Sequence, residues 1–246
     1  MRRRTIRPCT ILSIEFCEPV AHPLRMNRPD FPRSAFPRRV PLGSHASLVA
    51  IVAMCVAVEA TLLGSDQGLW GAAQWRGLAY QYGGFWRGLL GNWQPNYAAQ
   101  PYLMFVTYGF LHGGILHLSV NMITLVSLGR LVIERTGPWR FLMIYAVSLL
   151  GGAAGFAALS PAVQPMVCAS GALFGLLGAL AGWEWSARRL AREGIWPVLR
   201  LIGLLVALNA VMYWAMDGNL AWEAHLGGFV AGWAASLWPT ARRGAS

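Results

Sequence analysis

Hydrophobic and polar residues alternate in long blocks along this chain, and the apolar blocks carry very few charges. Six blocks have the roughly 17 to 25 residues that a membrane-spanning helix needs. They lie at about residues 47–64, 113–133, 138–159, 166–183, 197–216 and 220–238. Glu59 in the first block and Arg200 in the fifth lie close enough to an end for their charged groups to reach the interface. The pattern predicts an all-α membrane protein with six transmembrane helices.

Composition and charge distribution agree with this class and suggest an orientation. Of the 246 residues, 56% are hydrophobic and 12% are charged, which is about half the charged fraction of a soluble domain. All 20 basic residues are arginine, and 18 of them lie in the two tails or the loops that are cytoplasmic if the N-terminus is inside. The net charge of +10 is therefore explained by arginines placed according to membrane topology, and we expect no nucleic-acid partner. Arginine without lysine is typical of a GC-rich genome, so we expect a bacterial cytoplasmic membrane with both termini cytoplasmic.

The segments outside the six blocks are expected to differ in structure. Residues 1–46 are rich in arginine and proline and show little periodicity, which predicts a disordered cytoplasmic tail. Two roles are compatible with this tail: it contacts anionic lipids, or it is a dispensable leader. Residues 47–240 are expected to form the membrane domain. Within it, residues 65–100 are too polar to span but rich in aromatic residues, so we expect a short amphipathic structure at the outer interface, with an ordinary loop as the alternative.

Cysteines and histidines show no metal-binding spacing. The sequence has five histidines without an HExxH motif and four cysteines. Two of these cysteines lie in the predicted tail and two in predicted spans, so we expect no disulfides. We therefore expect neither a metal nor another cofactor.

Three of the predicted helices carry polar side chains at a similar depth, in the outer third of the bilayer. His117 and Asn121 lie four residues apart and share one face of the second helix, with His112 just ahead of it. Ser170 lies in the first turn of the fourth helix and His225 in the first turn of the sixth. Because these helices all enter from the same side, we expect the four side chains on the helices themselves to lie near one level.

These residue types match the requirements of a serine nucleophile. A serine hydroxyl becomes reactive when a neutral imidazole accepts its proton, and burial in the membrane favours the neutral form of His225. Donors for an oxyanion could come from His117, Asn121 and the Ser170 amide. No carboxylate falls where it could orient the imidazole, which predicts a Ser-His dyad. Taken singly, a serine is more often a packing residue and a buried histidine is often structural, so the combination carries the interpretation.

Glycines at intervals of four residues explain how two of these helices could meet. Small residues at this spacing let membrane helices approach backbone to backbone. We expect such contacts to dock the fourth helix on the sixth and to bring Ser170 to His225, with Phe174 packed on the imidazole. The glycines concerned are Gly171, Gly175 and Gly178 in the fourth helix, and Gly228 and Gly232 in the sixth.

Together, these motifs resemble the rhomboid family of intramembrane serine proteases over roughly residues 47–240. The family's second-helix pattern appears in "HGGILHLSVN", its serine motif in "CASGALFG" and its last-helix motif in "AHLGGFVAG". The resemblance implies a six-helix rhomboid bundle that cleaves transmembrane proteins near the outer membrane face. It implies that Ser170 is the nucleophile and His225 the base. It also implies that His117 and Asn121 are oxyanion donors and that His112 is a structural support.

One departure from the family pattern leaves a second function open. Cys168 stands two residues before the serine, where the family usually has glycine. We expect its thiol to be buried in apolar surroundings and therefore to be inert. An inactive rhomboid-like protein that binds membrane helices without cutting them is therefore the alternative. A small transporter or channel is a weaker one, because the sequence shows no internal repeats. The expected partners are transmembrane substrates and membrane lipids, and the sequence does not indicate an oligomeric state.

Overall fold

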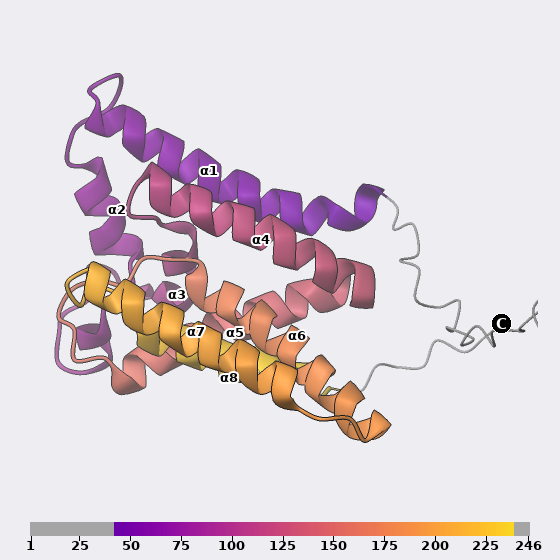
Figure 1. The fold of residues 1–246 in the computed structure, drawn as a ribbon. Coiled ribbons are helices and arrows are strands. Elements are labelled where there is room, and N and C mark those ends of the chain that lie inside the picture. The colour runs from indigo at the N-terminus through magenta and orange to yellow at the C-terminus, as the bar shows by residue number, and fades with distance from the viewer. Residues whose placement is uncertain (1–41, 239–246) are drawn as a thin grey trace, which may run out of the picture. The chain divides into compact units, whose positions relative to one another are not determined.

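The computed structural model describes residues 42–238, in which helices are joined by turns and irregular segments (Figure 1). An isolated bridge between Phe85 and Met166 is the β pairing found in this part of the chain. Three short 3-10 helices are η2 (Leu42–His45), η3 (Arg87–Leu90) and η4 (Tyr108–Phe110). The α-helices are α1 (Ala46–Asp66), α2 (Trp75–Gly83), α3 (Gln100–Thr107), α4 (Ile115–Thr136), α5 (Pro138–Leu159), α6 (Ser170–Ala191), α7 (Trp196–Ala215) and α8 (Trp222–Ser236).

Each of the six predicted apolar blocks coincides with one long helix. The predicted range 138–159 matches α5 at both ends, and the largest difference is at α6, which continues to Ala191. The tail was predicted to end at residue 46, but residues 42–46 already belong to η2 and α1. The rest of the predicted tail lies outside the described residues.

Four of these helices are long and apolar enough to cross a membrane, namely α1 with η2, α4, α5 and α7. The predicted fourth and sixth spans, α6 and α8, are not among them. α8 has 15 residues, fewer than the roughly 20 that a span needs, and α6 carries four glycines and ends in charged residues. Residues 42–238 are therefore all-helical with four helices able to span a membrane, and the count of six spans stays a prediction.

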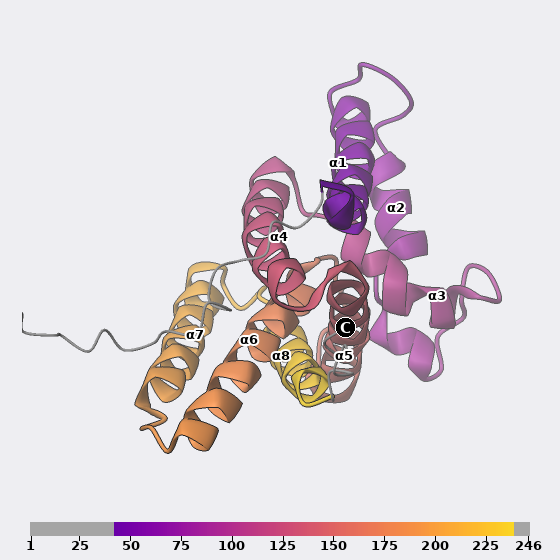
Figure 2. The same ribbon diagram turned by 90° about the vertical axis from the view of Figure 1, so that its right-hand side faces the viewer.

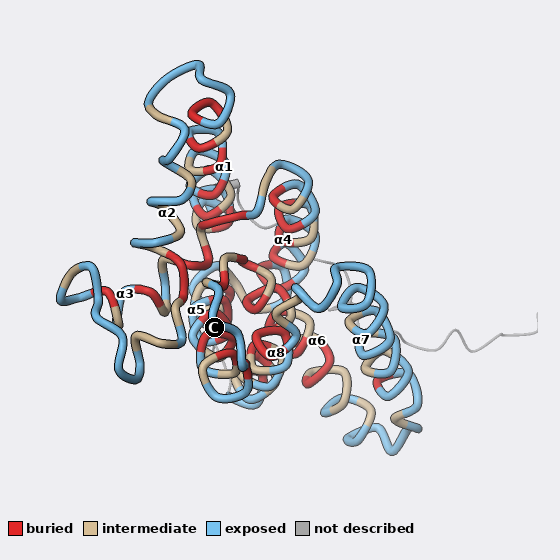
Figure 3. Tube along the Cα trace, turned by 90° about the vertical axis from the view of Figure 1, so that its left-hand side faces the viewer, coloured by how far each residue is buried: buried red, intermediate tan, exposed pale blue. Residues whose placement is uncertain are grey.

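The centre of the described part is built by α5, α6 and α8. α8 packs against both others and lies between them when the helices are seen end-on (Figure 2). α1 packs against α4, which in turn contacts α5 and α6. α7 lies beyond α6 and is mostly exposed, with Val198 as its buried residue (Figure 3). Ser170, the first residue of α6, thus lies on a helix that contacts both α4 and α8.

Glycines let α6 and α8 approach each other backbone to backbone. A Cβ on Gly228 would overlap the carbonyl oxygen of Gly171, and a Cβ on Gly232 would overlap that of Gly175. Gly178 likewise lies against the α8 backbone. α5 also approaches α8 through glycines, a contact that the sequence pattern did not predict. α6 and α8 therefore have no room for side chains where they cross.

Replacing Gly228 by alanine is expected to destabilise the protein by about 1 to 3 kcal/mol, because the added methyl group forces α6 and α8 apart. The melting temperature in detergent measures this effect. Gly203→Ala in α7 is the matched control, since a Cβ there meets nothing within 4 Å and alanine favours a helix. A Gly228→Ala variant that melts like the control would show that the close approach is not needed.

The polar segment after α1 is held in place by a buried ion pair. Arg76 in α2 donates to both carboxylate oxygens of Glu59, at 2.9 and 3.1 Å, and to Asp66 at 2.6 Å. The Tyr80 hydroxyl and the Arg76 guanidinium both donate to the backbone carbonyl of His112. The carboxylate of Glu59 is buried because Arg76 supplies the charge that offsets its loss of hydration. The expectation that this carboxylate lies near the membrane interface stays a prediction.

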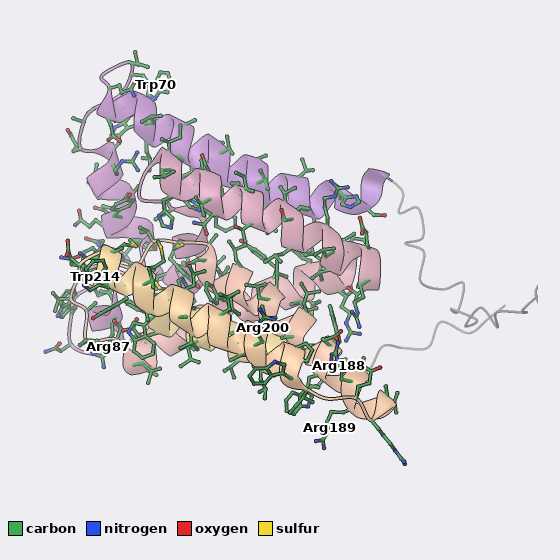
Figure 4. All side chains as sticks on the ribbon, viewed as in Figure 1. Trp70, Arg87, Arg188, Arg189, Arg200 and Trp214 are labelled. Carbon is green, nitrogen blue, oxygen red and sulfur yellow. The ribbon has the colours of Figure 1, made fainter. Side chains whose placement is uncertain are left out.

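Two exposed tryptophans and two neighbouring arginines lie at opposite ends of the helices. Trp70 and Trp214 lie at one end together with Arg87, and Arg188 and Arg189 lie at the other (Figure 4). Tryptophan is typical of the membrane interface, and arginine clusters are typical of cytoplasmic loops. The orientation of the chain in a membrane stays a prediction.

Candidate active site

Ser170 and His225 meet where the first turns of α6 and α8 lie side by side. The Ser170 hydroxyl oxygen lies 2.7 Å from Nε2 of His225, which is a short hydrogen-bond distance. The Phe174 ring stacks on the imidazole, with 4.1 Å between the ring centroids and an interplanar angle of 6°. The predicted packing of Phe174 on the imidazole is thus confirmed. The geometry allows the serine proton to pass directly to the imidazole.

The hydrogen bond on the other side of His225 determines which of its nitrogens carries the proton. Nδ1 lies 2.6 Å from the side-chain oxygen of Asn209 in α7, an acceptor. The Asn209 amide nitrogen is committed elsewhere, because it donates to the carbonyl of Leu205 at 2.9 Å. Nδ1 therefore carries the proton, and Nε2 keeps a free lone pair toward Ser170. This is the tautomer that a general base requires.

His117 has the opposite tautomer. Its Nδ1 accepts the backbone N–H of Gly113 at 3.1 Å, so the proton of the neutral ring resides on Nε2. Nε2 lies 2.9 Å from Sγ of Cys168 and donates to it. The two histidines of the site thus differ in chemistry: His117 offers a hydrogen-bond donor where His225 offers an acceptor.

The Cys168 thiol lies where the predicted oxyanion donors converge. Its Sγ accepts from His117 Nε2 and from the backbone N–H of Ser170, at 2.9 and 3.1 Å. The thiol faces the side-chain oxygen of Asn121 at 3.7 Å, while the Asn121 amide nitrogen donates to the carbonyl of His117. Asn121 therefore presents an acceptor to this pocket, and its amide must turn over before it can donate to an oxyanion. The thiol is buried as expected, but the expectation of apolar surroundings is wrong, because the sulfur occupies a pocket lined by hydrogen-bonding groups.

His112 lies behind His117 and packs against it. The side chain is fully buried, and its ring meets the His117 ring edge-on with 5.5 Å between centroids. Burial lowers the pKa of His112 to about 4, so the ring is neutral at physiological pH. Neither ring nitrogen has a hydrogen-bond partner among the described residues. The geometry is that of a packing residue that supports His117.

Two features of the site did not follow from the sequence pattern. Asn209 was not selected, although a lone amide in an otherwise apolar helix is a signal, because such a group needs a polar partner. The direction in which the Cys168 thiol points depends on the turn before α6, and no feature of the sequence predicts it.

Within residues 42–238, the His, Cys, Asp and Glu side chains form no group of three or more that could hold a metal ion. Cys55 and Cys168, the cysteines in this part of the chain, are free thiols. Proton transfer and hydrogen bonding are the chemistry that the site's own side chains offer.

Comparison with known proteins places the site inside one conserved domain type. A family model described as a rhomboid domain matches residues 99–241, a range that contains all the site residues above. The chain is 38% identical to RHOMBOID-like protein 5 of Arabidopsis thaliana over 125 residues, which are 50% of this chain and 39% of that protein. It is 35% identical to rhomboid protease GluP of Bacillus subtilis (strain 168) over 130 residues, 51% of this chain and 24% of that protein.

A longer match is with RHOMBOID-like protein 2 of Arabidopsis thaliana. The identity there is 32% over 167 residues, which are 66% of this chain and 44% of that protein. The chain therefore spans less than half of the length of each of these relatives.

Proposed function

The chain belongs to the rhomboid family, and we propose that it is an intramembrane serine endopeptidase in which Ser170 is the nucleophile and His225 the general base. The observation that carries this proposal is the 2.7 Å contact between the Ser170 hydroxyl and Nε2 of His225, with Nδ1 of the same ring bound to an acceptor. A serine beside an imidazole in its base tautomer is the minimum unit for acyl transfer.

The proposed reaction follows from the positions of the donors and acceptors. His225 Nε2 takes the proton as the Ser170 oxygen attacks a peptide carbonyl, and it later passes this proton to the departing amine. The Ser170 N–H and His117 Nε2–H, which both point to the Cys168 sulfur, would stabilise the oxyanion. The Asn121 amide adds a third donor once it has turned. Water then attacks the acyl-enzyme by the same route, and Ser170 is restored.

The proposal includes a membrane topology and a substrate class. We propose six spans, with α6 and α8 shielded from lipid by their neighbours, and both termini in the cytoplasm of a bacterial cell. The buried fraction of α6 and α8 residues supports this, since interior helices need not be as apolar as lipid-facing ones. The substrates are transmembrane proteins, cut near the outer membrane face. GluP, one of the relatives, is itself named a rhomboid protease.

Replacing Cys168 by glycine is expected to raise turnover by roughly three- to thirtyfold, because the sulfur leaves a pocket in which each oxyanion donor contributes a few kcal/mol. Without the thiol, the Asn121 side-chain oxygen loses its partner in the pocket, so the amide group can turn its nitrogen toward the oxyanion. The measurement is cleavage of a reporter transmembrane segment by both proteins in one membrane preparation. Cys55→Gly is unsuitable as a control inside α1, so Cys55→Ala, which removes the other described thiol, serves instead.

A folded Cys168→Gly protein without activity would show that the thiol has a positive role in the reaction. An inactive wild type that gains activity on this substitution would instead support the alternative function, a rhomboid-like protein that binds membrane helices without cutting them. The occupied pocket around Cys168 is the observation that favours this alternative.

Reconstituted cleavage tests the proposed function. The purified full chain is placed in liposomes with a reporter transmembrane segment that carries small residues near its outer end, and the products are identified by mass spectrometry. We expect one cut within or beside the membrane-spanning part of the reporter. The absence of a cut in several such reporters, with the protein shown to be folded, would count against protease activity and for the binding alternative.

A further inference from the structure

Asn209 connects α7 to the candidate general base, and we propose that it is a positioning residue that holds His225 in the orientation and tautomer needed to accept the serine proton. This proposal rests on the proposed protease function and adds a third residue to its dyad. Ser170, His225 and Asn209 lie on three different helices and form a continuous chain of two short hydrogen bonds, 2.7 and 2.6 Å long.

Phe174 cannot perform this positioning alone. Its ring is parallel to the imidazole and fixes the plane in which the imidazole lies. Stacking is the same after the imidazole turns over by half a rotation, because either face can lie on the phenyl ring. That rotation would replace Nε2 by a carbon atom opposite Ser170. The Asn209 oxygen distinguishes the two orientations, since it accepts an N–H and gains little from a C–H.

The same contact selects the tautomer. A neutral imidazole has one N–H, and the proton can reside on either nitrogen. The Asn209 oxygen stabilises the form with the proton on Nδ1, and the Leu205 carbonyl keeps this oxygen turned toward the ring by binding the amide nitrogen. In the other tautomer, Nε2 would present a proton to Ser170 and could not act as a base. A third group that orients the imidazole in this way is worth a large factor in the rate of other serine proteases.

The surroundings of Asn209 indicate why a polar residue is placed there. α7 is mostly exposed, and Leu204 and Leu208, which precede Asn209 in this helix, are exposed too. An amide in such an apolar helix costs free energy unless both of its polar groups are paired, and both are paired here. The buried residue through which α7 packs, Val198, lies eleven positions before Asn209, which is about three helical turns. Asn209 is therefore a specific contact with the imidazole at the far end of α7.

Two substitutions separate positioning from helix packing. Asn209→Leu keeps the approximate size of the side chain but removes the acceptor, and Asn209→Asp keeps an acceptor at the same place. In liposomes with the reporter segment, we expect Asn209→Leu to lower kcat about 10- to 100-fold with little change in KM. Asn209→Asp should retain activity within roughly a few-fold of the wild type. Leu208→Ala, at an exposed neighbouring position, is the matched control and should leave both constants unchanged.

A spectroscopic measurement tests the positioning role without relying on turnover. The ¹⁵N shifts of His225, assigned by comparison with His225→Ala, report which ring nitrogen is protonated. We expect a protonated Nδ1 in the wild type and in Asn209→Asp, and a mixture of tautomers in Asn209→Leu. Equal shifts in the wild type and Asn209→Leu, or a loss of activity in Asn209→Leu that only follows a lower melting temperature, would overturn the positioning role.

The two proposals can fail separately. A wild type that cuts no reporter while its His225 tautomer still depends on Asn209 would refute the protease function and support the contact. A wild type that cuts at the same rate as Asn209→Leu would refute positioning and leave the protease function intact.

Discussion

Ser170→Ala and His225→Ala are each expected to abolish cleavage of a transmembrane reporter while the protein stays folded. The first removes the nucleophile, and the second leaves the Ser170 proton without an acceptor at the 2.7 Å contact. Loss of turnover by roughly a thousandfold or more is expected for either change, because a nucleophile and its base act as one unit. For the same reason, the double variant should be no slower than either single one. The rates are measured in liposomes with equal amounts of folded protein.

Ser170→Ala removes few packing contacts, so its melting temperature should change much less than its activity. His225→Ala also loses the stack on Phe174 and the bond to Asn209, so some loss of stability is expected there and the rate is compared per amount of folded protein. Ser186→Ala serves as a control, since this α6 serine bonds only to the carbonyl of Gly182 in its own helix. Cleavage near the wild-type rate in Ser170→Ala would refute the assignment of the nucleophile. Inactivity of His225→Ala would not by itself identify His225 as the base, because the substitution also removes its contacts with Phe174 and Asn209.

Asn121→Ala is expected to lower kcat by roughly ten- to a thousandfold, since one donor in an oxyanion pocket contributes a few kcal/mol to the transition state. KM should change little, because the oxyanion forms only during the reaction. The structure adds a condition: in the wild type the Asn121 oxygen faces the Cys168 thiol, and the amide must turn before it can donate. We therefore expect the loss caused by Asn121→Ala to be larger in a Cys168→Gly background. Steady-state kinetics of the four proteins measure this coupling.

His112→Ala provides the contrast for Asn121→Ala. His112 is fully buried against His117, and its own ring nitrogens have no hydrogen-bond partner among the described residues. Its removal leaves a cavity, so the melting temperature should fall together with the activity. An Asn121→Ala protein that cuts as fast as the wild type would remove Asn121 from the site. One that loses stability as His112→Ala does would assign it a packing role instead.

The sequence predicted the helices well because long uncharged blocks leave few alternatives to a helix in a membrane. It also selected Ser170, His225 and His117, since polar groups in apolar blocks require a reason. The number of spans could not be settled in this way. α6 and α8 are rich in glycine because they pack backbone to backbone at the centre, and the same glycines make α6 less apolar than a lipid-facing helix.

The remaining parts of the site depend on rotations that no spacing rule encodes. The orientation of the Cys168 side chain into the pocket follows from the turn before α6, and the reach of Asn209 to His225 follows from how α7 lies beyond α6. The ion pair of Glu59 could not be predicted either, because its partner Arg76 lies 17 residues away in a segment without a clear hydrophobic pattern. Side-chain partners on separate helices therefore cannot be predicted from the sequence pattern alone.

Covalent labelling by a fluorophosphonate tests the central claim most directly, because the probe reacts with a serine only where a base activates it and donors stabilise the adduct. The full chain is labelled in membranes, and the modified peptide is identified by mass spectrometry. We predict one adduct, on Ser170, that disappears in both Ser170→Ala and His225→Ala. A folded wild type that carries no adduct on Ser170, or that is labelled equally well without His225, would contradict the assignment of this chain as a serine protease.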